Sequence, residues 1–240
     1  MQTPKAHRKP WTIGFPDVWI HADESAVKRH PNYMLAKSGD TDQAALLVNA
    51  LINTAVIEQM RSLQSFSPIL ISVHAEEEMG KNAIPEVMAD ILSAALGWPT
   101  EPDVVQANVV NHTGADGFSR MARQAVFAGN IVAGSNYVIV DDFIGQGGTV
   151  ANLRGHIETL GGKVLAATVL TGKPFSAKLS LSASQLALLR EKHGNNGNGI
   201  ETWWIDYFGF GFDCLTESEA RYLIRTPDAE HIRDRIIAST

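Results

Sequence analysis

The chain has a single cysteine, Cys214, which excludes an intrachain disulfide framework and a cysteine-rich zinc site. Its eight histidines contain no His-Glu-x-x-His spacing, so no zinc-protease helix is indicated. A run of about 18 apolar residues, as needed to cross a bilayer, is also missing. Because the first residues include no apolar stretch of the signal-peptide kind, we expect a cytoplasmic protein with no membrane partner.

An excess of positive charge is missing too. The formal net charge is −6. Because the negatively charged backbone of nucleic acids attracts basic surfaces, we expect no nucleic-acid partner. Hydrophobic residues make up 45% of the 240 residues and charged residues 19%, which is typical of a soluble globular protein. This length permits one large α/β domain or a core with a subdomain.

The most informative stretch runs from residue 137 to residue 149 and reads Tyr-Val-Ile-Val-Asp-Asp-Phe-Ile-Gly-Gln-Gly-Gly-Thr. Apolar, mostly β-branched residues lead into two adjacent acids and a glycine-rich turn. An apolar face at helical spacing follows, made of Val150, Leu153, Ile157 and Leu160. The pattern predicts a strand, a loop and a helix N-terminus, with carboxylates at the carboxyl end of the strand. Such a place suits a small ligand that carries both phosphate and hydroxyl groups.

The loop of this stretch is suited to an anion. Gly145, Gly147 and Gly148 let the backbone approach an anion closely and adopt positive φ where the turn needs it. Thr149 is a good N-cap whose hydroxyl can reach a phosphate oxygen. The free N–H groups of the first helical turn and the helix dipole favour negative charge at the same place.

The two acids, Asp141 and Asp142, have a different use, because like charges repel and a carboxylate does not bind phosphate. Carboxylates accept hydrogen bonds, which suits vicinal sugar hydroxyls or hydrated Mg²⁺. Two common glycine motifs do not fit: no lysine follows the glycine pair as in a P-loop, and a dinucleotide fingerprint starting at Gly145 has Val150 in place of its last glycine.

A hydrophobic strand, two acids and a loop ending in Gly-Gly-Thr resemble the signature of the type I phosphoribosyltransferases, which bind 5-phosphoribosyl 1-diphosphate (PRPP). The resemblance implies an α/β fold with a mainly parallel sheet flanked by helices and a small hood from the chain ends. It implies transfer of the phosphoribosyl group to a nitrogenous base or related acceptor, with Mg²⁺, and a homodimer. Residues 145–149, including Gln146, would hold the 5′-phosphate; Asp141 and Asp142 would hold the ribose hydroxyls, and Mg²⁺ through water.

A second loop of the resemblance follows a predicted strand at residues 68–74 and precedes a predicted helix from Ile84 to Leu96, with Pro85 in its first turn. Residues 79–85, Met-Gly-Lys-Asn-Ala-Ile-Pro, look like the Lys-Gly-Ile-Pro loop of orotate phosphoribosyltransferases. The resemblance implies a pyrophosphate loop made of Met79, Gly80, Lys81 and Asn82, in which Lys81 would meet pyrophosphate. The alternative is that Lys81 is a solvated loop lysine.

A third segment, residues 111–124, follows a predicted strand at 103–110. In type I enzymes the corresponding segment is a flap that closes over the reacting centre. Gly114 and Gly117 make the segment flexible, and its cationic groups are His112, Arg120 and Arg123. A guanidinium clamps phosphate oxygens well, so we expect Arg120 to take part in catalysis. The alternative for both arginines is a solvated helical face, and for His112 a local turn or cap hydrogen bond.

The flanking segments are less diagnostic. We expect residues 1–10 to be loose, a strand within 12–21, a helix capped by Asp40 or Thr41, and a strand at 163–170. Further predictions are a helix at 182–192, a strand at 201–207, a capping box at 216–220 and a last helix at 228–238. The predicted domains are an N-terminal segment 1–66, a core 67–192 and a C-terminal segment 193–240, with both outer segments as possible hood parts.

Six aromatic residues gather near the end of the chain: Trp203, Trp204, Tyr207, Phe208, Phe210 and Phe212. They can form the core of the hood, or an aromatic face can stack on a nucleobase. Three classes of function stay open. They are a phosphoribosyltransferase, a non-catalytic regulator that binds PRPP or a nucleotide, and a partner-binding module or another sugar-phosphate enzyme. Gln146 and Phe143, where most members carry threonine and a smaller aliphatic residue, motivate the second class.

Overall fold

The computed structural model describes residues 5–74, 76–77, 80–108, 116–194 and 199–239. A five-stranded sheet lies at its centre in the order β1-β9-β8-β2-β5, and every neighbouring pair of strands is parallel. The strands are β1 (Trp19–Ala22), β9 (Lys163–Gly172), β8 (Asn136–Ile144), β2 (Ile69–Ser72) and β5 (Thr100–Glu101). The predicted mainly parallel α/β fold is therefore confirmed.

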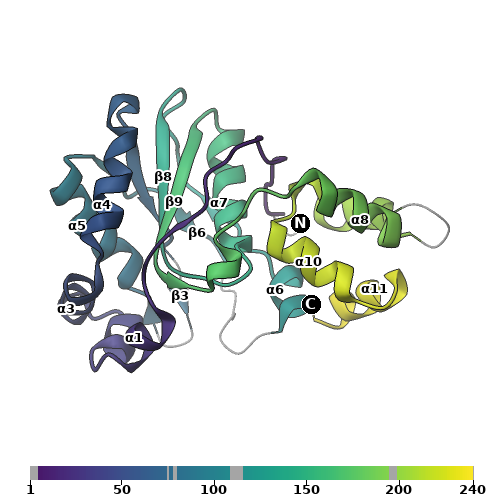
Figure 1. Cartoon of the computed structure of the whole chain (residues 1–240), viewed down its shortest axis with the longest axis horizontal. Coiled ribbons are helices and arrows are strands. Elements are labelled where there is room, and N and C mark those ends of the chain that lie inside the picture. Colours follow the sequence, from purple (N-terminus) through teal and green to yellow (C-terminus); the bar gives the residue numbers. More distant parts are fainter. Residues whose placement is uncertain (1–4, 75, 78–79, 109–115, 195–198, 240) are drawn as a thin grey trace.

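Helices cover both faces of this sheet (Figure 1). On one face lie α1 (Glu24–Arg29), α2 (Tyr33–Lys37), α3 (Thr41–Leu51), α4 (Thr54–Met60), the short η1 (Arg61–Phe66) and α5 (Ile84–Leu96). On the other face lies α7 (Gly148–Thr159). Successive side chains of a strand point to opposite faces, and in β8 Val138 and Val140 join the core under α3 to α5 whereas Tyr137 and Ile139 join the core under α7. Burial on both faces explains why β8 is apolar without alternation.

A helical unit, which we call the C-terminal unit, lies beyond α7 (Figure 1). It contains α6 (Gly117–Ala122), α8 (Ala183–His193), α9 (Glu201–Phe208), η3 (Phe212–Cys214), α10 (Glu217–Arg225) and α11 (Ala229–Ala238). Four of the six clustered aromatics, Trp204, Phe208, Phe210 and Phe212, are buried in its own hydrophobic core, as the hood-core interpretation predicts. Trp203 and Tyr207 stack on each other with ring centroids 5.0 Å apart.

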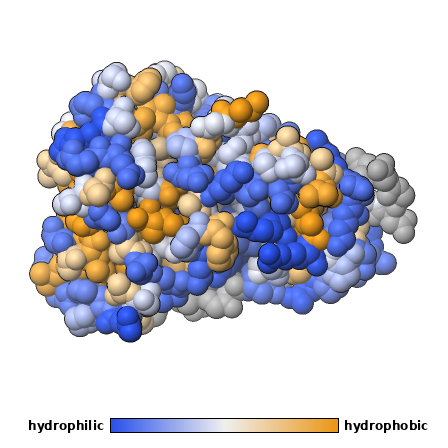
Figure 2. Space-filling model, in the orientation of Figure 1, coloured by the Kyte–Doolittle hydropathy of each residue, from blue (hydrophilic) through white to orange (hydrophobic). Residues whose placement is uncertain are grey.

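The remaining elements are short. Two antiparallel hairpins pair β3 (Glu76–Glu77) with β4 (Gly80–Lys81), and β6 (Val105–Gln106) with β7 (Phe127–Ala128); η2 (Pro174–Ser176) follows β9. In the part of the chain that the structure describes, no helix has both the length and the apolar character needed to span a bilayer. Figure 2 shows apolar residues dispersed among hydrophilic ones on the visible face, which is usual for a protein surface.

Several predicted elements are confirmed. The helix at 84–96 has its proline in the first turn, and Gly97 caps its end with φ +72°. Asp40 caps α3, and Thr216 with Glu219 forms the predicted capping box of α10. The predicted domain boundaries after residues 66 and 192 stay predictions. β1 belongs to the predicted N-terminal segment 1–66, yet it is an edge strand of the sheet. α8 belongs largely to the predicted core 67–192, yet it lies in the C-terminal unit.

Three strand predictions are wrong in whole or in part. Residues 201–208 form α9 rather than a strand, because Glu201, Trp204 and Phe208 share one buried helical face. Of the strand predicted at 103–110, the described residues 103–108 form only β6, which pairs in a two-residue hairpin with β7 outside the main sheet. The strand within 12–21 begins only at Trp19.

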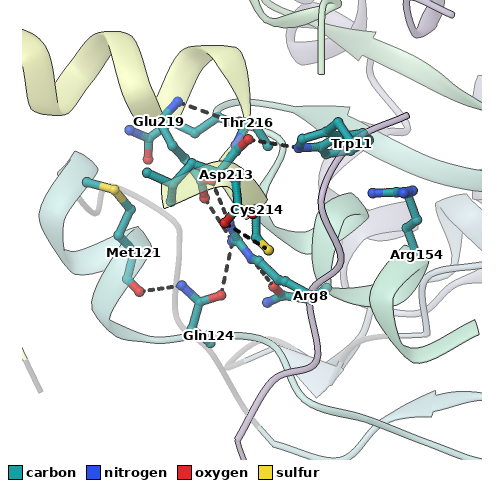
Figure 3. A network of polar contacts seen from close by, with 12 residues as sticks. Arg8, Trp11, Met121, Gln124, Arg154, Asp213, Cys214, Thr216 and Glu219 are labelled. Atoms are coloured by element: carbon teal, nitrogen blue, oxygen red, sulfur yellow. Dashed lines mark hydrogen bonds and ion pairs between the residues drawn. The ribbon is translucent and has the colours of Figure 1, made fainter. Parts of the chain in front are cut away.

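The N-terminal arm, residues 5–11, is not loose as predicted. It runs between α7 and the C-terminal unit and contacts both (Figure 3). Arg8 is buried and binds Glu219 of α10 through two hydrogen bonds, of 2.6 and 2.9 Å, and Asn152 of α7 through a third of 2.6 Å. Trp11 donates its indole N–H to the carbonyl of Leu215 at 2.8 Å. The arm therefore fastens the C-terminal unit to the sheet.

Candidate functional site

The two acids lie near the carboxyl end of β8, the middle strand of the sheet. Both are buried: Asp141 is 6% and Asp142 8% exposed. Asp141 Oδ1 accepts a hydrogen bond from the backbone N–H of Asp142 at 2.8 Å. Asp142 Oδ2 accepts one from Nζ of Lys37, at the end of α2, also at 2.8 Å. Lys37, 105 residues earlier in the chain, thus supplies a cationic partner to the diacid.

The two carboxyl groups differ in their readiness to ionise. Burial raises the pKa of Asp141 well above its usual value, and the adjacent charge of Asp142 raises it further. Burial also opposes the ionisation of Asp142, but Lys37, through its charge and hydrogen bond, and a hydrogen bond from Asn82 outweigh it, so the pKa of Asp142 is lowered. The pKa values of the two carboxyl groups therefore shift in opposite directions, so Asp142 ionises more readily than Asp141.

The glycine-rich loop follows directly and opens α7. Gly147 is the N-cap of α7, with φ +83°, a conformation that a side chain would strain. Thr149 lies in the first turn, so the prediction that it is the N-cap is wrong. Of the three loop glycines only Gly147 has positive φ. The backbone N–H groups of the first turn begin at Gly148, as an anion site at a helix N-terminus requires.

Arg120 of α6 lies against this loop. A Cβ built on Gly145 would stand 2.6 Å from Nη1 of Arg120 and 3.3 Å from the ring of Phe143. The absence of a side chain at Gly145 is therefore what lets the guanidinium approach the loop. The structure brings together the diacid, residues 145–149 and Arg120, three of the groups that the sequence predicted for the site.

The C-terminal unit packs on the same loop. Thr216 Oγ1 donates to the carbonyl of Gln146 at 2.6 Å, and a Cβ on Gly148 would lie 2.8 Å from Oε1 of Glu219. Among the described residues, Gln146 Oε1 is one of the few buried polar side-chain atoms without a hydrogen-bond partner. Gly145, Gln146, Gly148 and Thr149 are nevertheless only partly buried, so the loop keeps an accessible side.

The predicted pyrophosphate loop lies beside the diacid only in part. Asn82 is buried and hydrogen-bonds Asp142. Lys81 turns instead toward α5, where its Nζ pairs with Oε2 of Glu86 at 2.9 Å. Glu86 also faces Nδ1 of His74 at 3.7 Å, and burial lowers the pKa of that histidine. The pyrophosphate role of Lys81 stays a prediction.

The other predicted groups lie elsewhere. Arg123 donates to the carbonyl of Ser239 at 3.1 Å, near the end of the chain. Met79 and His112, with the side chains of residues 76–78, lie outside the described residues. Sequence reasoning missed Lys37 and Arg8, and it marked Glu219 only as part of a capping box. No local pattern indicates their ion pairs, because each partner lies more than 100 residues away.

Mg²⁺ prefers oxygen ligands and is often held by one or two carboxylates together with substrate phosphates. Within the described ranges, no group of three or more His, Cys, Asp or Glu side chains forms a metal cage. The ionised Asp142 with its neighbour Asp141 fits the smaller arrangement, in which hydrated Mg²⁺ is shared with a ligand's phosphate oxygens.

Curated proteins with similar sequences are longer than this chain. Protein TraN of Escherichia coli is 39% identical over 236 residues, which cover 98% of this chain and 52% of that protein. An uncharacterized protein of Haemophilus influenzae is 36% identical over 157 residues, or 65% of this chain and 35% of that protein. The chain thus spans about half the length of the first relative and about a third of the second. No family model matches the chain.

Solved structures similar to this chain are adenine and purine phosphoribosyltransferases. An adenine phosphoribosyltransferase from Leishmania tarentolae matches with a TM-score of 0.37 at 14% identity and covers 85% of this chain and 88% of that one. A purine phosphoribosyltransferase from Pyrococcus horikoshii matches with a TM-score of 0.35 at 20% identity, covering 56% and 74%. At such low identities and scores, the likeness carries no argument about what this chain does.

Proposed function

We propose that this chain is a type I phosphoribosyltransferase that binds PRPP at the carboxyl end of β8 and transfers the phosphoribosyl group to a nitrogenous base or related acceptor. One observation carries the proposal. A buried diacid, whose second carboxylate is paired with Lys37, is followed at once by a glycine loop that opens a helix. Hydroxyls at the diacid and a phosphate at the helix N-terminus are the two ends of a ribose 5-phosphate.

The reaction is a displacement at C1′ of the ribose. The acceptor nitrogen forms a bond to C1′, the bond from C1′ to the pyrophosphate oxygen breaks with its electron pair, and the acceptor's proton passes to water. Positive charge develops on the ribose ring while negative charge leaves with pyrophosphate. The site must therefore hold both ends of the ribose and stabilise charge on the leaving group.

Each group has a role in this scheme. Asp142 accepts a hydrogen bond from one ribose hydroxyl, and Asp141 forms a hydrogen bond with the other. Residues 145–149 bind the 5′-phosphate through backbone N–H groups, and Arg120 beside Gly145 supplies positive charge. Mg²⁺, held through water by Asp141 and Asp142, would neutralise charge on the departing pyrophosphate.

The test is release of pyrophosphate from PRPP with Mg²⁺ and a panel of purine and pyrimidine bases. We expect turnover by the unaltered chain with at least one base. The double variant Asp141→Ala with Asp142→Ala is expected to lose it while keeping the circular dichroism of the unaltered chain. Asp206→Ala, an exposed aspartate in α9, is the matched control and is expected to retain full activity. Turnover by the double variant at the unaltered rate would refute the assignment.

A second function, a PRPP-binding regulator without catalysis, is motivated by Gln146 and Phe143, the two positions of the signature stretch that depart from the family resemblance. Calorimetry distinguishes the two functions, because a regulator would bind PRPP and release no pyrophosphate with any base. A chain that binds no PRPP would instead be a partner-binding module or another sugar-phosphate enzyme. The homodimer implied by the family resemblance is tested by sedimentation.

A further inference from the structure

Lys37 is held where two parts of the site meet. The turn that ends α2 lies directly on the loop at residues 80–83: the N–H of Ala83 donates to the carbonyl of Ala36 at 3.2 Å. A Cβ on Gly80 would stand 2.7 Å from the carbonyl oxygen of Ser38. The backbones on both sides of Lys37 are therefore fixed against this loop, while its ammonium reaches Asp142 on β8.

Lys37 and Lys81 differ in how far their ion pairs are exposed to water. The side chain of Lys37 is 18% exposed and that of its partner Asp142 11%. The side chains of Lys81 and its partner Glu86 are 51% and 42% exposed. Water screens charges strongly, so an ammonium acts more strongly on a ligand from the less exposed position. The partner of Lys81 lies on α5, whereas the partner of Lys37 is Asp142 of the diacid itself.

We propose that Lys37, rather than Lys81, is the lysine that contacts the pyrophosphate group of PRPP, an inference that rests on the proposed phosphoribosyltransferase function. A ribose held by Asp142 and a pyrophosphate held by the backbone of residues 80–82 are joined through the C1′–O bond. That bond would then lie between β8 and the loop at residues 80–83, the two elements that Lys37 bridges. An ammonium has three N–H donors, so Lys37 keeps one on Asp142 and offers another to an oxygen of the leaving group.

A purely structural role for Lys37 makes a different prediction. If Lys37 only neutralises Asp142, it has no effect once that charge is removed. The experiment therefore compares Lys37→Met in the unaltered chain and in an Asp142→Asn background, with inorganic pyrophosphate and Mg²⁺ as the probe in calorimetry. Lys81→Met is the matched control, because it removes the same group from the neighbouring loop on which the end of α2 lies.

We expect Lys37→Met to weaken pyrophosphate binding at least about tenfold in both backgrounds, as loss of a hydrogen bond from a charged donor does. Lys81→Met is expected to change it less than about twofold, as for an exposed, screened charge. Lys37→Arg, which keeps the charge, should retain most of the affinity. A loss that vanishes in the Asp142→Asn background, or a loss with Lys81→Met alone, overturns the inference.

A second measurement needs no destabilising variant. In the unaltered chain, the side-chain nitrogen NMR resonance of Lys37, assigned with Lys37→Arg, is expected to shift on addition of pyrophosphate with Mg²⁺, and that of Lys81 to stay in place. Failure of this inference is distinguishable from failure of the proposed function. A chain that binds PRPP and transfers its phosphoribosyl group, yet shows no shift at Lys37, overturns only the inference. A chain that binds neither PRPP nor pyrophosphate overturns both.

Discussion

At the scale of single residues, the site depends on how burial and one lysine divide the charge of two neighbouring acids. Without Lys37, burial would push both aspartates toward the protonated form. With Nζ of Lys37 at 2.8 Å, the pKa of Asp142 is lowered while that of Asp141 stays raised. Asp142 therefore ionises more readily than Asp141 and is the better acceptor for a ribose hydroxyl.

Another buried residue, His21 on β1, makes stability depend on pH. Its ring accepts a hydrogen bond from the N–H of Asn53 at 3.0 Å and contacts the hydroxyl of Thr168 at 3.1 Å. Burial lowers its pKa from 6.5 to about 4. Because the folded pKa is depressed, the stabilisation is fully present above pH 6.5 and is lost as pH falls toward 4.

We therefore expect His21 to reduce the free energy of unfolding by about 3 kcal/mol between these two pH values. Urea denaturation of the unaltered chain and of His21→Gln at each pH isolates the effect from that of the carboxylates. The stability difference between the two proteins should shrink as the pH falls. An unchanged difference across this range would show that His21 is not buried in its neutral form.

At the scale of elements, local sequence patterns predicted most of the helix bounds and caps, because these depend on residues close together in the chain. The helix from Ile84 to Leu96 follows from its apolar spacing and Pro85, and the capping box at Thr216 follows from its residue types. The strand predicted at 201–207 was wrong because bulky aromatics favour strands on propensity alone, whereas tertiary burial of Trp204 and Phe208 selects the helix. The pair of Lys37 and Asp142, 105 residues apart, leaves no trace in either local pattern.

The capping box of α10 also supports the candidate loop. Thr216 is fully buried; its hydroxyl accepts from the N–H of Glu219 at 3.1 Å and donates to the carbonyl of Gln146. Thr216→Ala removes both bonds and is expected to lower the free energy of unfolding by about 2 kcal/mol. Thr216→Ser, which keeps the hydroxyl, should lose much less. Equal losses in the two variants, measured by urea denaturation, would mean that the methyl group matters and the hydrogen bonds do not.

At the scale of the whole molecule, the N-terminal arm joins the C-terminal unit to α7 (Figure 3). Arg8 binds Glu219 with 1% and 2% of the two side chains exposed. Its guanidinium also lies 4.8 Å from the ring centroid of Phe210. Since Glu219 lies against Gly148, the same pair fixes the C-terminal unit on the glycine loop.

Removing one partner of a buried ion pair leaves an uncompensated charge, so Arg8→Met is expected to destabilise the chain by about 3–5 kcal/mol. Adding Glu219→Gln removes that charge and should restore part of the loss. Lys9→Met, at the exposed neighbouring position, is the control and should change stability little. If thermal unfolding of Arg8→Met matches that of Lys9→Met, the arm does not hold the two cores together.

The central claim is that the diacid and the glycine loop together bind a ribose that carries a 5′-phosphate. Titration of PRPP with Mg²⁺ into the chain by calorimetry at neutral pH tests it most directly, alongside Asp142→Asn. The account predicts saturable binding to the unaltered chain and a loss of at least about tenfold in the variant. No binding to the unaltered chain, or equal affinity for both proteins, would contradict it.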